Sequence, residues 1–360
     1  LRETLSDIDT VSRQGGDEFL VALADVDDLA VVSSLAGRMQ RRLAQPFTLK
    51  GMQLVTSISI GIALFPGDGE DFDTLLRHAD MAMYQAKSAG RNAYCFFDER
   101  MNADNRERLA LELDLRQALS RDEFVLQYQP IVDLRSGRLL AAEALLRWRH
   151  PEFGLLGPDR FIGAAERSGL IVEIGEWALG EACRQAMLWQ AGGLPRFVMS
   201  VNLSAVQFRR GNLGEVVQAA LTRYGLSPSG LELELTESIL LQDCEQLRQL
   251  KELGVKLSID DFGTGYSNLA YLQRFQVDKL KIDQSFVRGL GNNPQNQAIV
   301  TAIVQMARSL GLHTVAEGIE DEATRQLLVE LGCDQGQGYL FARPLPAGEL
   351  VASMREAVVG

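Results

Sequence analysis

Polar side chains, most of them oxygen-bearing, lie at the ends of short apolar stretches between residues 121 and 341. Asp260 and Asp261 follow Leu257-Ser258-Ile259, and Asn202 follows Met199-Ser200-Val201. If such stretches are parallel strands of one sheet or barrel, their carboxyl ends lie on the same side and these residues converge there. The residues placed in this way are Glu143, Asn202, Glu234, Glu237, Asp260, Asp261, Lys281, Asp283, Glu317 and Gln337.

Carboxylates gathered at one end of a sheet repel one another unless cations neutralise them. Oxygen ligands select hard cations such as Mg²⁺ or Mn²⁺. Adjacent Asp260 and Asp261 could place one carboxylate between two ions, and ions roughly 3.5–4 Å apart are the usual clamp for phosphodiester hydrolysis. Lys281 would be a fixed cation suited to orienting a water or stabilising developing charge. Each acid alone is better explained as a surface carboxylate or a helix cap, so the metal site rests on the whole set.

The elements that must position these residues alternate between β-rich and helical patterns from residue 121 onward. Roughly 240 residues with this alternation predict an α/β fold, a (β/α)8 TIM-like barrel. Only a turn at Ser136-Gly137 separates the first two strands, so we expect a hairpin and one antiparallel strand. The predicted strands are Phe124–Gln129, Leu139–Arg147, Phe197–Leu203, Leu231–Thr236, Lys256–Asp261, Lys279–Asp283, His313–Glu317 and Gln337–Phe341.

Residues 1–98 predict a separate, smaller α+β unit. Helical spacing covers Leu29–Ala44 and Phe72–Ser88, and β-rich stretches cover Phe19–Ala24, Leu54–Leu64 and Tyr94–Phe97. Residues 99–120 are polar, helix-prone and free of Pro and Gly, so we interpret them as a helical connector or as the first helix of the second domain.

The composition excludes several classes of protein. The 360 residues are 46% apolar and 23% charged, an ordinary globular mix that excludes disordered and fibrous chains. The net charge of −12 disfavours binding to a nucleic-acid polymer, which needs a basic surface. No apolar run approaches the ~18 residues of a membrane span, so we expect no membrane segment in this chain. The first residue is not Met, so we expect a piece of a longer protein in which a sensor or membrane region could lie upstream.

Cysteine and histidine are too scattered to form a site of their own. The four cysteines contain no C-x-x-C pair, and we expect buried, reduced thiols and a cytoplasmic location rather than disulfides or a zinc framework. With only three histidines, we expect neither a His-based metal site nor a His-based catalytic triad. The cysteines are Cys95, Cys183, Cys244 and Cys333, and the histidines are His78, His150 and His313.

Seven motifs in order make residues 105–355 resemble the EAL family of cyclic-di-GMP phosphodiesterases. They are Glu143-Ala144-Leu145-Leu146-Arg147-Trp148, Asn202-Leu203-Ser204, Glu234-Leu235-Thr236-Glu237, Asp260-Asp261-Phe262-Gly263-Thr264-Gly265, Lys281-Ile282-Asp283, Glu317-Gly318 and Gln337-Gly338-Tyr339.

The resemblance implies a role for each of these residues. The first of two Mg²⁺ or Mn²⁺ ions would be held by Glu143, Asn202, Glu234 and Asp260. The second would be held by the shared Asp260 and by Asp261, with Glu317 nearby. The implied catalytic residues are Lys281, which positions the attacking water, Glu317, Glu143 and Asp260. Glu237 would anchor the loop from Asp261 to Asn268, and the implied substrate-binding residues are Gln129, Pro130, Arg147, Asp283 and Gln337.

Residues 1–98 resemble the later part of a GGDEF domain, the diguanylate cyclase fold. The match is carried by Arg13-Gln14-Gly15-Gly16-Asp17-Glu18-Phe19 and by a phosphate-contacting segment with Lys87 and Arg91. On its own, a Gly-Gly pair fits a plain hairpin equally well. The family's first strand, with its metal-binding Asp, and its inhibitory R-x-x-D motif are both expected to be missing. The resemblance therefore implies a degenerate nucleotide site at Gly15, Gly16, Asp17, Glu18, Lys87 and Arg91.

Together, the resemblances imply a bacterial signalling enzyme that hydrolyses cyclic-di-GMP to linear pGpG. Two alternatives remain open: a catalytically silent cyclic-di-GMP receptor, and a full-length protein with both cyclase and phosphodiesterase activity. The family also implies a homodimer, and the first domain implies weak binding of GTP. Intact Glu143, Lys281 and Glu317 favour the enzyme over the receptor.

Overall fold

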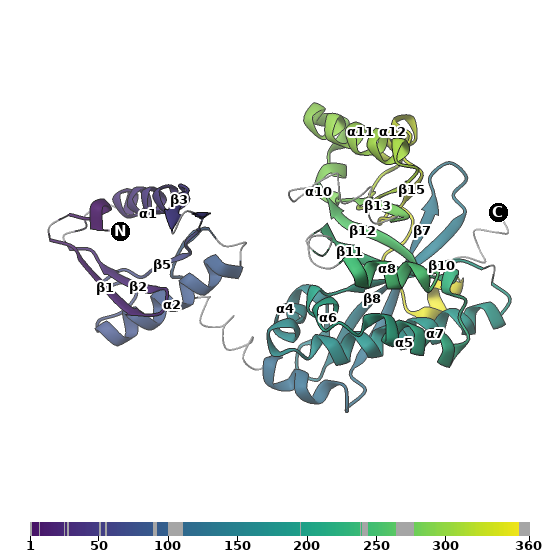
Figure 1. Ribbon diagram of the computed structural model, residues 1–360, viewed down its shortest axis with the longest axis horizontal. Helices are drawn as coiled ribbons and strands as arrows, with labels where there is room; N and C mark the ends of the chain where they lie inside the picture. The colour runs from purple at the N-terminus through teal and green to yellow at the C-terminus, as the bar shows by residue number, and fades with distance from the viewer. Residues whose placement is uncertain are drawn as a thin grey trace. The chain divides into compact units, whose positions relative to one another are not determined.

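The computed structural model describes most of the chain and divides it into two units. The described residues are 2–6, 8–24, 26, 29–49, 52–54, 56–88, 92–99, 111–194, 196–237, 239, 244–263 and 277–352. Contacts between Cα atoms separate Leu1–Ala110 from Leu111–Gly360 (Figure 1). Among the described helices, none combines the length and the apolar character that crossing a bilayer requires.

The second unit is a closed barrel. Within its described part, a nine-stranded sheet closes on itself because β8 pairs with both β7 and β10, and β9 (Gly154–Leu156) is an extra strand on the edge of β8. Strand β7 runs antiparallel to both of its neighbours, and the other barrel pairs are parallel. The predicted (β/α)8 barrel with one antiparallel strand is confirmed. Its strands are β7 Phe124–Asp133, β8 Leu139–His150, β10 Val198–Leu203, β11 Leu231–Thr236, β12 Lys256–Phe262, β13 Lys279–Ile282, β14 His313–Ala316 and β15 Gln335–Gly336.

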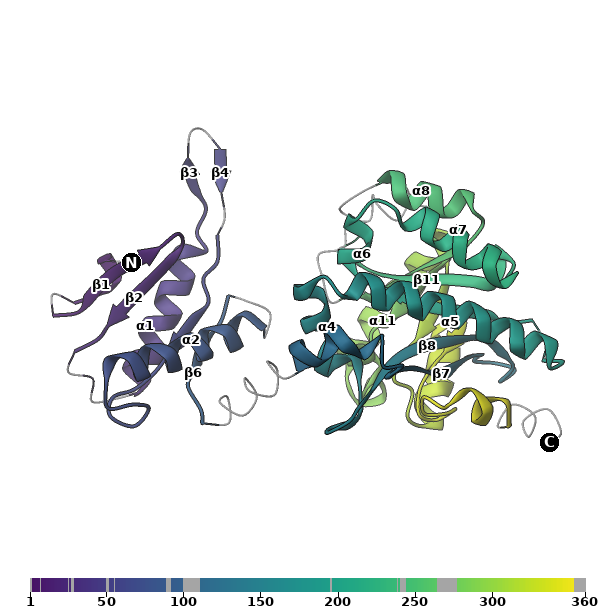
Figure 2. The same ribbon diagram turned by 90° about the horizontal axis from the view of Figure 1, so that it is seen from below.

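Helices cover the outside of this barrel. The long helix α5 (Figure 2) buries Ile174, Ala178 and Ala182 against the strands, and α11 and α12 lie side by side (Figure 1). Side-chain caps begin four of the described helices: Ser204 caps α6, Asp283 caps α10, Asn293 caps α11 and Asp321 caps α12. The helices are α4 Pro158–Ser168, α5 Ile171–Ala191, α6 Ala205–Arg209, α7 Leu213–Tyr224, α8 Cys244–Glu252, α10 Gln284–Val287, α11 Pro294–Ser309 and α12 Glu322–Leu331, with 3-10 turns η2 Pro228–Gly230 and η4 Leu290–Asn292.

The final predicted strand, Gln337–Phe341, is wrong. The last barrel strand is β15, Gln335–Gly336, and the chain then turns so that the Leu340 amide donates to the Ile319 carbonyl. Gly338 explains the turn, because a Cβ there would lie 2.1 Å from the Ile319 oxygen and 2.3 Å from its nitrogen. The backbones approach too closely for any side chain, and Gln337 is left just beyond the strand end.

In its described residues, the first unit has two α-helices and three strand pairs. Helix α1 (Leu29–Leu43) and helix α2 (Phe72–Ser88) match the predicted helices. The predicted strand Leu54–Leu64 is wrong as one element, because its start belongs to a hairpin and only β5 pairs with β6. The strands are β1 Thr10–Gly15, β2 Glu18–Ala22, β3 Phe47–Leu49, β4 Met52–Leu54, β5 Ile60–Ile62 and β6 Tyr94–Phe96, and η1 covers Arg2–Thr4.

The connector and the thiols can be described in part. Residues 101–110 lie outside the described residues, whereas residues 111–118 are helical and bury Leu111 and Leu115 in the second unit. Cys183 and Cys333 are free and buried, and Cys95 is free and half-buried. The side chain of Cys244 lies outside the described residues.

The close approach at Gly338 gives a prediction about stability. Gly338→Ala forces Ile319 and its neighbours apart, so the free energy of unfolding in denaturant should fall by about 2 kcal/mol or more. Gly291→Ala is the matched control, since a Cβ there meets no atom within 4 Å. Equal stability of the two variants would contradict the steric explanation of the turn.

Candidate active site

A single lysine ammonium lies at the centre of the barrel mouth. Lys281 Nζ is 2.5 Å from Glu234 Oε2, 2.6 Å from Glu317 Oε1, 3.1 Å from Asp260 Oδ1 and 3.5 Å from Glu143 Oε2. The Lys281 side chain is only 2% exposed. The structure therefore brings four of the predicted site carboxylates onto one buried cation.

The strand alternation delivers these groups to one place. Along a strand, successive side chains point to opposite faces, so one set faces the barrel interior. Glu143 belongs to β8, Glu234 to β11, Asp260 to β12 and Lys281 to β13, and Glu317 directly follows β14. These strands are parallel, so their carboxyl ends form the same mouth.

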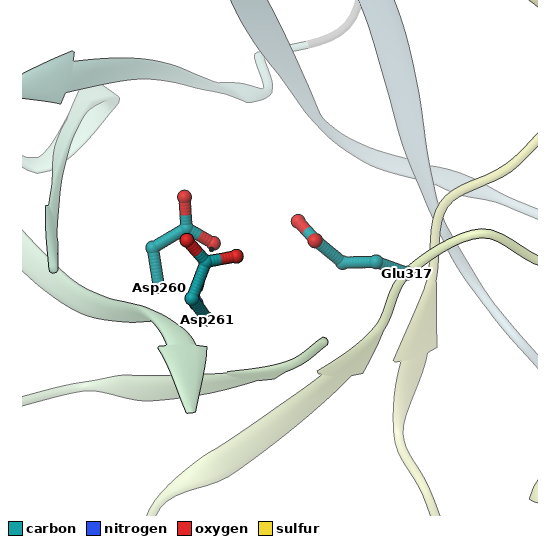
Figure 3. A group of neighbouring side chains, drawn as sticks. All are labelled: Asp260, Asp261 and Glu317. Atoms are coloured by element: carbon teal, nitrogen blue, oxygen red, sulfur yellow. Dashed lines mark hydrogen bonds between the residues drawn. The ribbon is translucent and has the colours of Figure 1, made fainter. Parts of the chain in front are cut away.

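Asp261 reaches the site through an irregular backbone. In a regular strand it would point away from the face that carries Asp260, but the pairing of β12 with β13 shifts register between Ile259 and Phe262. Asp261 also has a φ of 54°, in the left-handed region that few residues adopt. As a result both aspartates face Glu317 (Figure 3), and one ligand oxygen from each lies within 4.8 Å of the others.

Amide side chains hold Glu143 in place. Asn202 Nδ2 donates to Glu143 Oε1 at 2.6 Å, and Gln337 Nε2 donates to Glu143 Oε2 at 2.7 Å. The same Gln337 nitrogen donates to Gln129 Oε1 at 2.9 Å, and Gln129 Nε2 donates to the Ala342 carbonyl at 3.0 Å. This chain of amides fixes both oxygens of Glu143 and brings the predicted Gln129 and Gln337 into the site.

The buried charges shift one another's pKa in opposite directions. Burial, followed by repulsion from Glu143, raises the pKa of Glu234 well above its usual value. Burial acts on Glu143 in the same sense, but Lys281 and the bonds from Gln337 and Asn202 outweigh it, so the pKa of Glu143 is lowered. Burial would lower the pKa of Lys281, yet the surrounding carboxylates raise it well above its usual value.

The acids exceed the charge that Lys281 can balance. Burial, followed by the charge of Asp260, raises the pKa of Asp261 to about 6. Burial raises the pKa of Glu317 to about 7 although Lys281 opposes the shift. Surplus carboxylates with oxygen donors alone fit a hard divalent cation. The group of Asp260, Asp261 and Glu317 is thus an acidic cluster able to hold a divalent metal ion.

Arg147 and Pro130 lie on the paired strands β8 and β7. Arg147 lies four residues beyond Glu143 on β8, half-buried, and its Nε donates to Gln127 Oε1 at 2.9 Å. Burial lowers the pKa of Arg147. Pro130 is buried within β7, opposite Ala142.

Asp283 and Glu237 have other surroundings. Asp283 follows β13 and caps α10, where its Oδ1 accepts from the Ser285 amide at 2.9 Å, and its charge also contributes to the raised pKa of Asp261. Both carboxylate oxygens of Glu237 are buried without a hydrogen-bond partner among the described residues. The loop that Glu237 was predicted to anchor extends into residues 264–268, which lie outside the described residues.

The motifs did not identify Ser200 and Gln127. Ser200 Oγ donates to Glu234 Oε1 at 2.5 Å, and Gln127 accepts from Arg147. Each lies two residues before a predicted site residue, Asn202 or Gln129, on the same strand. The alternation of side chains along a strand therefore predicts that both Ser200 and Gln127 face the barrel interior.

The first unit places its predicted nucleotide residues on separate elements. Gly15 ends β1 and pairs with Glu18 of β2, and Gly16 and Asp17 form the turn between them, with Gly16 at a φ of 52°. Asp17 and Glu18 are exposed. Lys87 is exposed in the last turn of α2, and Arg91 lies outside the described residues.

Comparison with known proteins assigns both units. Residues 112–344 match the family model of the EAL domain, and residues 1–93 match that of the diguanylate cyclase GGDEF domain. The chain belongs to the EAL family. Its EAL domain is the barrel, and the part before it matches the GGDEF domain.

Curated relatives are similar to this EAL chain over nearly all its length. It is 49% identical over 350 residues to "Bifunctional diguanylate cyclase/cyclic di-GMP phosphodiesterase MucR" of Pseudomonas aeruginosa, covering 96% of this chain and 51% of that protein. It is 43% identical over 359 residues to "Cyclic di-GMP phosphodiesterase NbdA" of the same organism, covering 99% and 46%. The chain thus spans about half the length of these relatives. The solved structure "PaMucR Phosphodiesterase, c-di-GMP complex" is 50% identical, with a TM-score of 0.65, and covers 67% of this chain and 99% of that one.

The raised pKa values predict that cation binding depends on pH. Below about pH 6 for Asp261 and about pH 7 for Glu317, the carboxyls carry protons that a cation must displace. Affinity for Mn²⁺ should therefore rise on the order of tenfold between about pH 6 and pH 7.5. Calorimetry in buffers of different ionisation enthalpy would measure the released protons. Glu317→Gln should release fewer, and an affinity independent of pH would contradict the assignment.

Proposed function

We propose that the EAL domain hydrolyses cyclic-di-GMP to linear pGpG with the help of divalent metal ions. The observation that carries this proposal is the set of four carboxylates around Lys281, with Asp261 beside them. The printed names of the similar MucR and NbdA proteins, and of the MucR complex with c-di-GMP, support the choice of substrate.

The proposed cofactors are two Mg²⁺ or Mn²⁺ ions. Because every donor is an oxygen, hard cations fit the ligand set. When bound, such ions supply Lewis acidity toward the phosphate and activate a water molecule. The proposed ligands are Glu143, Asn202, Glu234 and Asp260 for one ion, and Asp260, Asp261 and Glu317 for the other.

The chain's own residues would orient the reaction. Water attacks phosphorus in line, the bond to the 3′ oxygen breaks, and that oxygen leaves with a proton. Lys281 is fixed by its carboxylates, so its positive charge is already in place when negative charge grows on the phosphoryl oxygens. The amide chain from Asn202 to Gln129 keeps Glu143 from rotating.

Substrate contacts are proposed for the polar rim. Arg147 would meet the nucleotide, since its guanidinium has further donors beyond those to Gln127 and the Leu146 carbonyl. Gln129, Pro130, Gln337 and Asp283 complete the proposed binding set. Homodimer formation belongs to the same proposal.

The domain organisation follows the same line of argument. We propose a partial GGDEF domain at residues 1–98, a connector at 99–120 and an EAL barrel at 105–355. Weak GTP binding is proposed for the turn at Gly15–Glu18 together with Lys87 and Arg91. Titration with GTP would test it, with a Gly16→Pro variant as the control for the turn.

Incubation of this chain with cyclic-di-GMP and Mg²⁺ tests the proposed reaction. We expect pGpG as the product, no turnover in excess chelator, and recovery with Mg²⁺ or Mn²⁺. Ca²⁺ is larger and a weaker Lewis acid, so it should support binding with little hydrolysis. Tight binding of cyclic-di-GMP without turnover in either Mg²⁺ or Mn²⁺ would replace the enzyme with a receptor.

Substitution of Lys281 should separate catalysis from binding. Lys281→Ala removes a preorganised positive charge, so the single-turnover rate should fall by on the order of 10²–10³. Substrate affinity should change far less, because binding is spread over many contacts. Glu143→Ala should instead weaken both metal binding and turnover. Lys251→Ala, which loses a half-buried ion pair with Asp278, is the control. A near wild-type rate for Lys281→Ala would refute its catalytic role.

A further inference from the structure

A second buried ion pair lies one layer below the site. Glu232 precedes Glu234 by two residues on β11, and Lys279 precedes Lys281 by two residues on β13. Lys279 Nζ lies 3.0 Å from Glu232 Oε2 and 3.1 Å from Oε1, with the side chains 6% and 1% exposed. By strand alternation this pair faces the barrel interior, as the site residues do.

Ser200 links the lower pair to the site. Its hydroxyl lies 2.5 Å from Glu234 Oε1 and 3.4 Å from Glu232 Oε1, and the residue is fully buried. A hydroxyl has a single proton to donate, so only one of the two carboxylates can receive it. Both carboxylates therefore compete for the same buried donor.

Lys279 decides this competition. A buried carboxylate without a partner is costly, and it would draw the nearest donor toward itself. Lys279 Nζ donates to Glu232 Oε1, the same oxygen that lies 3.4 Å from the Ser200 hydroxyl, and it also lies 3.0 Å from Oε2 as an ion pair. Because Lys279 already serves this oxygen, the Ser200 proton is left for Glu234. Glu234 then has a fixed partner on each oxygen, Ser200 on Oε1 and Lys281 on Oε2.

We propose that Glu232 and Lys279 are positioning residues that commit Ser200 to Glu234 and so orient Glu234 as a cation ligand. The inference rests on the proposed function only in that Glu234 is taken to bind the cation. Partners that orient a metal ligand commonly change metal affinity by about 10–100-fold when they are removed. Neither Glu232 nor Lys279 belongs to the group around Lys281, so the pair acts through Ser200.

The test measures Mn²⁺ affinity by calorimetry without substrate. Lys279→Met exposes Glu232 to the Ser200 hydroxyl, and Ser200→Ala removes that hydroxyl, so each should weaken Mn²⁺ binding about tenfold. Because both changes break the same link, the double variant should also lose about tenfold, whereas independent effects would multiply to about a hundredfold. Multiplied losses, or unchanged affinity in a folded Lys279→Met, would overturn the proposal.

Two controls match these variants. Ser258 is a fully buried serine of β12 whose hydroxyl has no hydrogen-bond partner among the described residues, so Ser258→Ala should keep wild-type Mn²⁺ affinity. Lys251→Met loses an ion pair with Asp278 away from Ser200 and should also keep it. A tenfold loss in either control would mean that the effect is not specific to Ser200 and Lys279, and would overturn the proposed link.

A third variant covers the case in which Lys279→Met does not fold. Replacing both partners of a buried ion pair with apolar residues is often neutral, so Glu232→Met combined with Lys279→Met should fold. With no competitor left, Ser200 still donates to Glu234, and Mn²⁺ affinity should stay within about threefold of wild type. A tenfold loss in this folded variant would overturn the proposal. If wild type itself binds no Mn²⁺, the proposed metal site fails instead.

Discussion

The interaction on which this structure depends is the attraction between one buried ammonium and four carboxylates. Like charges repel more strongly in a barrel mouth than in water, because the protein interior screens them less. Lys281 balances only one of the negative charges. Burial and the repulsion between the remaining carboxylates raise the pKa values of Glu234, Asp261 and Glu317. The fold serves this arrangement by bringing strand ends together, and a divalent cation is the natural partner for the remaining charge.

The adjacent aspartates show how backbone irregularity completes the site. A regular strand could offer only Asp260 to the mouth, since its neighbour would face outward. The register shift in β12 and the left-handed conformation of Asp261 turn the second carboxylate to the same side (Figure 3). Strained backbone of this kind is expected where function requires it, and the surrounding barrel must hold it in place.

Sequence patterns predicted much of this arrangement, for physical reasons that also explain the failures. Apolar stretches with polar ends predicted the barrel and the site residues, because alternation and parallel pairing are local rules. The prediction of a strand at Gln337–Phe341 was wrong because the backbone at Gly338 packs closely against the backbone of Ile319, which is distant in sequence. The conformation of Asp261 and the pairing of Glu232 with Lys279 could not be predicted from the sequence either, since both depend on which strands become neighbours.

Charge also links the stability of the barrel to the cation that it would bind. Each buried carboxylate favours whichever partner neutralises it, and any ligand that binds only the folded chain stabilises that state. The four contacts of Lys281 partly offset the repulsion, but they cannot remove it, because one positive charge faces several negative ones. Replacing an acid with an apolar residue would relieve the repulsion and discard the ligand, the usual conflict between stability and activity. The barrel therefore retains the mutually repelling carboxylates. The Glu232–Lys279 pair, the side-chain amides that donate to Glu143 and the hydroxyl of Ser200 keep these carboxylates oriented.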